Sequence, residues 1–262
     1  MVTPSYVKLF EDGTLRQRAE RANALLRACS LCPRACGCDR TADEIGFCGT
    51  GQKACVAGVH PHFGEEVDDV QLAEMMLHLA AQGCHNINLV TPTHVIPQIL
   101  NALLIAAEKG LSLPLVYNCG GYERAEVLQL LEGIVDIYMP DFKFWDSSWS
   151  TRYCAAEDYP EIARSALREM HRQRGDLRTD EQGVATSGLL VRHLVMPQGV
   201  AGTRELCRFL AEEISPATYL HIMGQYRPCA EAVTDAVINR VPSRSEMQEA
   251  AAAAEEYGLT RV

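Results

Sequence analysis

The chain has 262 residues, of which 47% are hydrophobic and 22% charged, a composition typical of a globular protein with one large domain or a domain with a small appendage. Its 24 basic and 34 acidic side chains give a formal net charge of −10, which disfavours binding to nucleic acid phosphates. The first residues predict no secretion signal, and no apolar stretch is long enough for a membrane span. The cysteine count of eleven is odd, which favours a reducing compartment over disulfides. We therefore expect a cytoplasmic protein that binds neither membranes nor nucleic acid.

The predicted elements begin with an amphipathic helix over residues 15–28, a cysteine-rich segment and a short strand over residues 54–59. Another helix follows, with Asp68 as its N-cap, Gln71 three residues later, and Gly83 as its end. Further strands are predicted at residues 86–90, 113–117, 134–139, 189–196 and 219–223. Further helices are predicted at residues 99–108, 123–131, 160–172 and 203–213, and two more finish the chain, the second over residues 245–257. Residues 144–159 and 173–187 are predicted to be irregular.

This alternation of strands and helices predicts an α/β fold built from parallel βαβ units. We therefore divide the chain into residues 1–66, which hold the N-terminal helix and the cysteine-rich segment, and residues 67–262, which hold the α/β domain.

Six of the eleven cysteines lie between Cys29 and Cys55. The spacing of Cys29, Cys32, Cys36 and Cys48 can bring four thiolates to one point, as a tetrahedral Zn²⁺ or an iron–sulfur cluster requires. Cys38 and Cys55 are interpreted as spare ligands. Free thiols or disulfides are the alternative, and a nucleophilic cysteine at position 84 or 119 is a further one.

Polar side chains follow five predicted strands in succession, at the end where parallel α/β folds place their functional groups. They are Thr91, Thr93 and His94, then Asn118, then Asp141 and Lys143, then Arg192 and His193, and finally Gln225 and Arg227. Five such groups indicate a lined ligand cavity, whereas one alone would indicate only a solvated loop.

Several long motifs carry a resemblance to a known family. They are LCPRAC at residues 31–36, GFCG at 46–49, HFGEE at 62–66, GCHNINLVTPTH at 83–94, VDIYMPDFK at 135–143, RHLVMP at 192–197 and QYRPC at 225–229. With these motifs the chain resembles the radical SAM proteins that are similar to pyruvate formate-lyase activating enzyme.

The resemblance implies a partial (β/α)6 TIM barrel that binds S-adenosylmethionine (SAM) and a [4Fe–4S] cluster. It also implies a reductant such as flavodoxin or ferredoxin, and hydrogen abstraction from a protein, such as a glycyl-radical enzyme, or from a small molecule. The implied SAM-binding residues are Thr91, Thr93, His94, Asn118, Asp141, Lys143 and Arg192, with His193 beside the last. The motifs assign no catalytic residue and fix no substrate.

The sequence departs from the family at one point. Radical SAM enzymes carry a CxxxCxxC loop after the first barrel strand, and this sequence has no CxxxCxxC. Glu66 joins Val67 directly, where similar proteins have the first strand and that loop. We therefore expect an incomplete barrel and impaired SAM cleavage. The alternative is a catalytically inactive protein, or one stabilised by zinc on four cysteine ligands, with a binding or structural role.

Overall fold

The computed structural model describes residues 3–57 and 64–262, so the end of the strand predicted at 54–59 and part of the HFGEE motif lie outside the described residues. The chain forms two compact units. Unit 1 comprises Met1–Asn118 with Glu123–Asp136, and unit 2 comprises Cys119–Tyr122 with Ile137–Val262.

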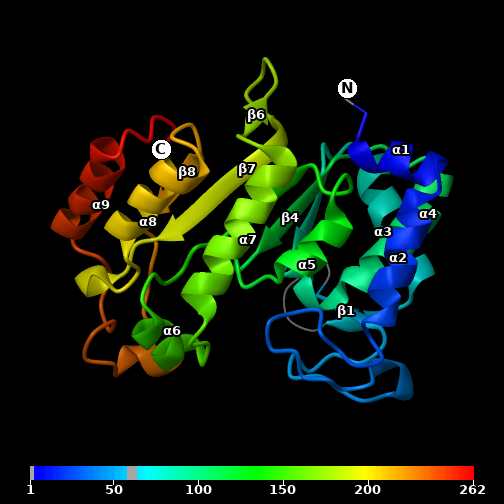
Figure 1. Cartoon of the computed structure of the whole chain (residues 1–262), viewed down its shortest axis with the longest axis horizontal. Helices are drawn as coiled ribbons and strands as arrows, with labels where there is room; N and C mark the ends of the chain where they lie inside the picture. The colour runs from blue at the N-terminus through cyan, green and yellow to red at the C-terminus, as the bar shows by residue number, and fades with distance from the viewer. Residues whose placement is uncertain (1–2, 58–63) are drawn as a thin grey trace. The chain divides into compact units, whose positions relative to one another are not determined.

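The helices of unit 1 pack around one central helix, α4 (Ile96–Glu108), which contacts α1 (Ser5–Glu11), α2 (Thr14–Ala24) and α3 (Asp69–Ala81), as Figure 1 shows. Eight of the thirteen residues of α4 are buried, because apolar side chains surround nearly its whole circumference. A short helix, α5 (Ala125–Leu128), completes the set. The predicted capping box of α3 is confirmed, since the side chains and backbone amides of residues 68 and 71 bond reciprocally.

The strands of unit 1 form two pairs. β1 (Ala54–Val56) runs antiparallel to β2 (Glu65–Val67), and β3 (Ile87–Val90) runs parallel to β4 (Leu115–Cys119). All five residues of β4 are buried, as expected for a strand covered on both faces. The register pairs Val90 with Asn118, so the ends of the two parallel strands lie side by side.

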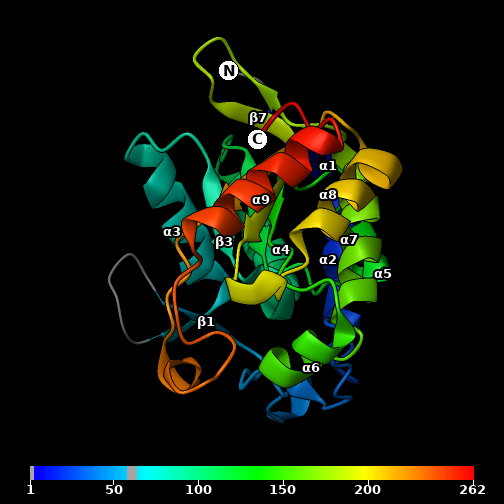
Figure 2. The ribbon, with the colours of Figure 1, turned by 90° about the vertical axis from the view of Figure 1, so that its left-hand side faces the viewer.

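Unit 2 contains the strands β5 (Ile137–Pro140), β6 (Arg178–Thr179), β7 (Ala185–Leu194) and β8 (Tyr219–Met223). β7 pairs in parallel with β5 and β8 and antiparallel with β6. The helices of this unit are α6 (Ser147–Cys154), α7 (Tyr159–Arg174), α8 (Thr203–Phe209) and α9 (Arg244–Glu256). α7 packs on β5 and β7. α9 lies beside α8, as Figure 2 shows.

The predicted α/β class is therefore confirmed, with mostly parallel strand pairs, and the strand predicted at 219–223 has the observed bounds. Three local expectations are wrong. The segment 144–159 contains α6, the segment 173–187 contains β6 and the start of β7, and the first of the two terminal helices is only a 3-10 turn, Ala230–Val233.

Gly188 explains why the start of β7 was missed. Its φ of +115° is open to glycine alone, and a Cβ at this position would lie 2.4 Å from the carbonyl oxygen of Asp176. A glycine inside a strand weakens the sequence signal, but here it allows the close approach of another backbone segment.

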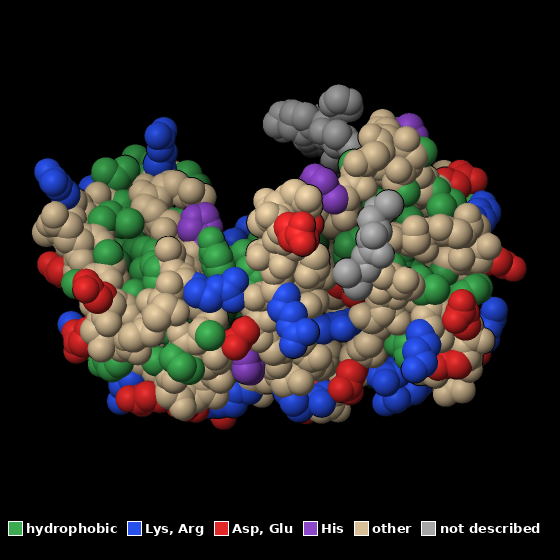
Figure 3. Space-filling view, turned by 90° about the horizontal axis from the view of Figure 1, so that it is seen from above, with side chains coloured by type: hydrophobic (Ala, Val, Ile, Leu, Met, Phe, Trp, Pro, Cys, Tyr) green, Lys and Arg blue, Asp and Glu red, His purple; other side chains and the backbone are tan. Residues whose placement is uncertain are grey.

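In the described part of the chain, no helix has the length and apolar character that crossing a bilayer requires. On the face seen in Figure 3, basic and acidic side chains are interspersed.

Candidate metal centre and ligand site

Three cysteine side chains of unit 1 converge. The Sγ atoms of Cys29, Cys36 and Cys38 all lie within 4.8 Å of one another, and those of Cys36 and Cys38 are 3.5 Å apart. The backbone fixes this arrangement, because the Cys29 amide donates to the Cys38 carbonyl at 2.9 Å and the Gly37 amide donates to the Cys29 carbonyl at 3.0 Å. Gly37 has a φ of +70°, which lets the chain reverse between two ligating positions.

A fourth cysteine faces the same space through Gly46. A Cβ at Gly46 would lie 3.4 Å from the Sγ atoms of Cys36 and Cys38, and 3.5 Å from that of Cys48. Glycine therefore leaves room for three sulfur atoms that point toward one place. Together with Cys29, these residues form what we call the cysteine centre: Cys29, Cys36, Cys38 and Cys48.

As we define it, the cysteine centre has Cys38, which had been interpreted as a spare, in place of the predicted ligand Cys32. The group whose sulfur atoms lie within 4.8 Å of one another contains the predicted ligands Cys29 and Cys36 together with Cys38, and neither Cys32 nor Cys48 belongs to it. Cys32 lies beside the centre, and burial raises the pKa of its thiol, with the nearby Cys29 and Cys48 adding to the shift. The signal in the sequence was Cys36-Gly37-Cys38, since a glycine between two cysteines lets both side chains turn to one side.

Two properties of the cysteine centre suit a metal ion. The Phe47 amide hydrogen-bonds to the Cys36 sulfur and lowers the pKa of that thiol to about 7, so a thiolate is available at Cys36 near neutral pH, whereas burial and the neighbouring Cys36 raise the pKa of the Cys38 thiol to about 11. Around a tetrahedral Zn²⁺, with Zn–S bonds of about 2.3 Å, neighbouring thiolates stand about 3.8 Å apart. The spacing of the Cys29, Cys36 and Cys38 sulfur atoms is therefore compatible with a single ion.

The turn after β3 carries three of the predicted SAM-binding residues. Thr91 has φ +54° and ψ +51°, the left-handed conformation that a β-branched residue rarely adopts. Its amide donates to the carbonyl oxygen of Asn118 at 2.7 Å, which joins the ends of β3 and β4. Thr91 and His94 also line a largely apolar cavity of about 500 Å³, to which α3 contributes Leu72 and Met76.

A buried carboxylate supports this turn. Glu123 is 2% exposed, and it accepts hydrogen bonds from the Thr93 hydroxyl at 2.6 Å and the Tyr117 hydroxyl at 3.0 Å. Glu123 was not among the predicted site residues, because a single acidic residue at the start of a predicted helix gives no sign of burial.

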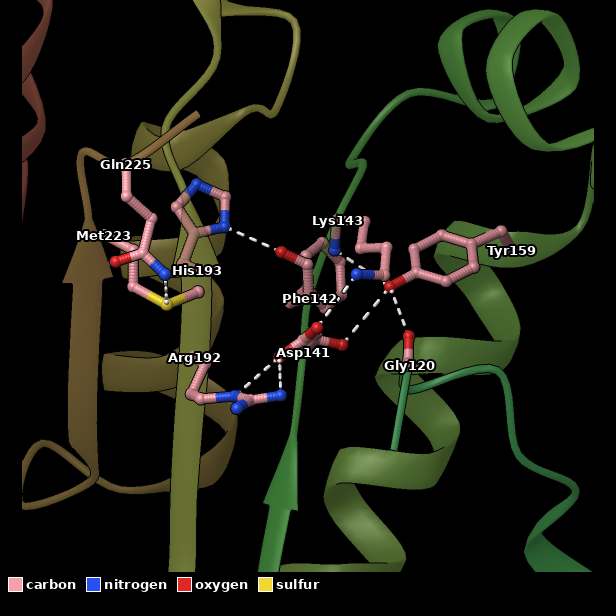
Figure 4. A network of polar contacts seen from close by, with 9 residues as sticks. All are labelled: Gly120, Asp141, Phe142, Lys143, Tyr159, Arg192, His193, Met223 and Gln225. Carbon is pink, nitrogen blue, oxygen red and sulfur yellow. Dashed lines mark hydrogen bonds and ion pairs between the residues drawn. The ribbon is translucent and has the colours of Figure 1, made fainter. Parts of the chain in front are cut away.

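In unit 2, Asp141 joins two cations, as Figure 4 shows. Its Oδ1 accepts from Arg192 Nε and Nη2, both at 2.7 Å, and its Oδ2 accepts from Lys143 Nζ at 2.8 Å. Asp141 follows β5 and bridges in parallel to Arg192 of β7, so the strand pairing itself brings these two residues together. One carboxylate and two cations leave a net charge of +1, which suits the carboxylate of a ligand.

Tyr159 holds the backbone around this ion group. Its hydroxyl donates to the Gly120 carbonyl at 2.9 Å and accepts from the Lys143 amide at 2.8 Å. Gly121 has a φ of +79°, and a Cβ there would lie 2.3 Å from the carbonyl oxygen of Asp141. Tyr159 lies at the end of a segment predicted to be irregular, so no feature of its sequence context singled it out.

His193 is placed differently from its neighbour Arg192. Its side chain is fully buried, with Nδ1 2.8 Å from the Phe142 carbonyl and Nε2 2.9 Å from the Thr203 hydroxyl. A carbonyl only accepts, so Nδ1 carries the proton and Nε2 accepts from Thr203. Burial lowers the pKa of His193 to about 4, so the ring is neutral and supports the backbone next to Asp141.

The structure thus brings the eight predicted SAM-binding residues into two groups. Thr91, Thr93, His94 and Asn118 lie in unit 1, and Asp141, Lys143, Arg192 and His193 lie in unit 2. Of the polar residues predicted at the last strand end, Gln225 contacts the sulfur of Met223 at 3.7 Å.

No family model matches the chain. An uncharacterized protein of Methanocaldococcus jannaschii is 30% identical to it over 177 residues, which are 66% of this chain and 47% of that protein. The chain therefore spans about half the length of this relative.

Proposed function

We propose that this chain is a radical SAM-like protein with a metal–thiolate centre at Cys29, Cys36, Cys38 and Cys48. The observation that carries the proposal is the convergence of the Sγ atoms of Cys29, Cys36 and Cys38 within 4.8 Å. Thiolates in this number and spacing are the ligands of structural zinc sites. The motifs that resemble the radical SAM proteins support the wider assignment to an incomplete partial barrel of that family.

A single zinc ion is the metal we favour. In an iron–sulfur cubane each cysteine binds a different iron, so the thiolates stand farther apart than around one ion. The 3.5 Å between the Sγ atoms of Cys36 and Cys38 favours one shared ion. A [4Fe–4S] cluster at the same cysteines is the second candidate, supported by the resemblance, and it would keep radical chemistry open to the chain.

The strand-end residues of unit 2 supply a site for the charged groups of SAM. Asp141 holds the cationic groups of Lys143 and Arg192 in place, so little side-chain freedom is lost when they take up a carboxylate. The same geometry would also hold the carboxylate of another small zwitterion.

SAM binding and SAM cleavage place different demands on the chain. Cleavage needs a cluster with one iron left open to SAM, which family members hold with a CxxxCxxC loop, and this sequence has none. We therefore propose that the protein binds SAM without cleaving it at an enzymatic rate. If the second candidate holds instead, the substrate is a protein or a small molecule, and flavodoxin or ferredoxin is the expected reductant.

The experiment that tests the centre is the zinc, iron and acid-labile sulfide content of protein purified without oxygen. We expect about one zinc per chain and no sulfide. Cys38→Ser should lose the metal, whereas Cys154→Ser, an exposed cysteine of unit 2, should keep it. Iron with sulfide would favour the second candidate, and full metal content in Cys38→Ser would show that our ligand assignment is wrong.

SAM binding is tested separately by calorimetry. Arg192→Gln removes one of the two cations on Asp141, and we expect it to weaken SAM binding by at least about tenfold, because it removes a charge-assisted contact. Arg178→Gln, an exposed residue of the same unit, is the matched control. Equal affinities of the two variants would contradict the assignment of this site.

A further inference from the structure

The side chain of Arg40 is fully buried, although its guanidinium group is always charged. Within residues 3–57 and 64–262, no carboxylate lies within ion-pair distance of it. Its Nε donates to the Gly51 carbonyl at 2.8 Å, and its Nη1 donates to the His94 carbonyl at 2.6 Å. Two neutral carbonyl oxygens do not balance a buried positive charge.

The group that can supply the negative charge is the cysteine centre. Arg40 Nη1 lies 4.0 Å from the Sγ atom of Cys29, and Nη2 is buried without a hydrogen-bond partner among the described residues. A divalent ion with four thiolate ligands carries a net charge of −2. Such a centre next to Arg40 would stabilise the guanidinium in its buried position.

Arg40 therefore connects two places in unit 1. Its Nη1 atom lies next to the Cys29 sulfur and also donates to the carbonyl of His94 in the turn Pro92–Val95. Each terminal nitrogen of a guanidinium carries two hydrogens, so Nη1 can make both contacts at once. The same turn follows Thr91, whose left-handed backbone conformation needs support from its surroundings.

We propose that Arg40 is a positioning residue that couples metal occupancy of the cysteine centre to the order of the turn Pro92–Val95. The inference rests on the metal centre of the proposed function. With the metal bound, the thiolate charge holds Arg40, and Arg40 holds the His94 carbonyl. Without the metal, the sulfur atoms are no longer held together beside Arg40, and the contact that positions the turn weakens. The centre thereby controls a turn that the resemblance assigns to SAM binding.

The test is amide hydrogen exchange of the full chain, followed by mass spectrometry, with zinc bound and after zinc removal by a chelator. In the wild-type protein we expect zinc removal to speed exchange in peptides that cover residues 91–99 by about tenfold, the effect of one hydrogen bond from a charged group on an opening equilibrium. Peptides from α8 in unit 2 serve as the internal control and should not change.

Arg40→Gln distinguishes coupling from a general loss of structure. All four cysteines remain, so the variant should still bind about one zinc, but exchange at residues 91–99 should be fast with or without zinc. Arg40→Lys keeps the positive charge but lacks the planar guanidinium with its several donors, and hydrogen exchange in this variant should lose most of its dependence on zinc. If Arg40→Gln does not fold, the coupling is still tested by Arg40→Lys and by the comparison of wild-type protein with and without zinc.

Two results would overturn the coupling while leaving the metal centre intact. One is wild-type protein that binds zinc but shows the same exchange at residues 91–99 in both states. The other is an Arg40→Gln protein that keeps the zinc dependence. A wild-type protein without any bound metal would instead refute the proposed function, and the metal content measured on the same samples separates this outcome from the other two.

Discussion

Acidification tests the role assigned to His193. The ring is fully buried, with its Nδ1 proton donated to Phe142 and its Nε2 occupied by the Thr203 hydroxyl. The pKa of His193 is about 4 in the folded protein, against an ordinary value of about 6.5 in the unfolded chain. The unfolded chain therefore binds a proton at a pH where the folded protein does not, so stability falls as the pH drops from about 6.5 to about 4.

The magnitude follows from these two values. Each pH unit in this window removes about 1.4 kcal/mol, so His193 alone should lower the free energy of unfolding by about 3 kcal/mol between pH 7 and pH 4. The assay is urea unfolding at several pH values on the wild type and on His193→Gln, which has no titrating group at this position. The difference between the two proteins isolates the histidine from the carboxylates, which titrate in both.

A wild-type protein whose stability relative to His193→Gln does not change between pH 7 and pH 4 would refute the assigned burial of a neutral His193.

A second pair of variants tests which nitrogen of His193 carries the proton. Thr203→Val leaves Nε2 without a donor and should lower the free energy of unfolding at pH 7 by about 1–3 kcal/mol, whereas Thr203→Ser keeps the hydroxyl and should change it little.

Three further predictions concern the same unit and the proposed chemistry. Tyr159→Phe removes the hydroxyl that joins Gly120 to Lys143, and urea unfolding should show a loss of about 1–3 kcal/mol. Gly121→Ala should destabilise the protein by more than Gly183→Ala. Both glycines have similar positive φ, but only at position 121 would the Cβ meet the Asp141 carbonyl, and equal losses would contradict this contact. With SAM and a strong reductant, 5′-deoxyadenosine should form at no enzymatic rate, so chromatographic detection of steady turnover would contradict the proposal.

Local chemistry explains what could be predicted from the sequence. The N-terminus of α3 was predicted because Asp68 and Gln71 form a capping box without help from the rest of the fold. The polar strand ends were predicted because strands end where apolar runs stop. The pairing of Asp141 with Arg192 depends on the parallel register of β5 and β7, which a single sequence does not give.

Tertiary contacts explain what could not be predicted. Cys38 belongs to the cysteine centre because the Cys29 amide bonds to its carbonyl, a contact between two loop segments. Tyr159 and Glu123 acquire their roles from burial, and neither shows it in its immediate sequence. Arg40, a residue type that is usually exposed, is buried for the same reason, since it lies between segments that are far apart in the chain.

In the proposed function, the number of thiolates separates SAM binding from SAM cleavage. A metal that keeps one coordination position open can take a substrate group, whereas an ion with four protein ligands is closed. If Cys48 completes the group of Cys29, Cys36 and Cys38, a single ion there has no position left for the amino or carboxyl group of SAM. The strand-end site at Asp141, Lys143 and Arg192 needs no metal to attract a carboxylate. The proposed SAM binding by these side chains therefore does not depend on the cluster chemistry that radical SAM enzymes use for cleavage, and loss of metal in Cys38→Ser should leave the unit 2 contribution to SAM affinity in place.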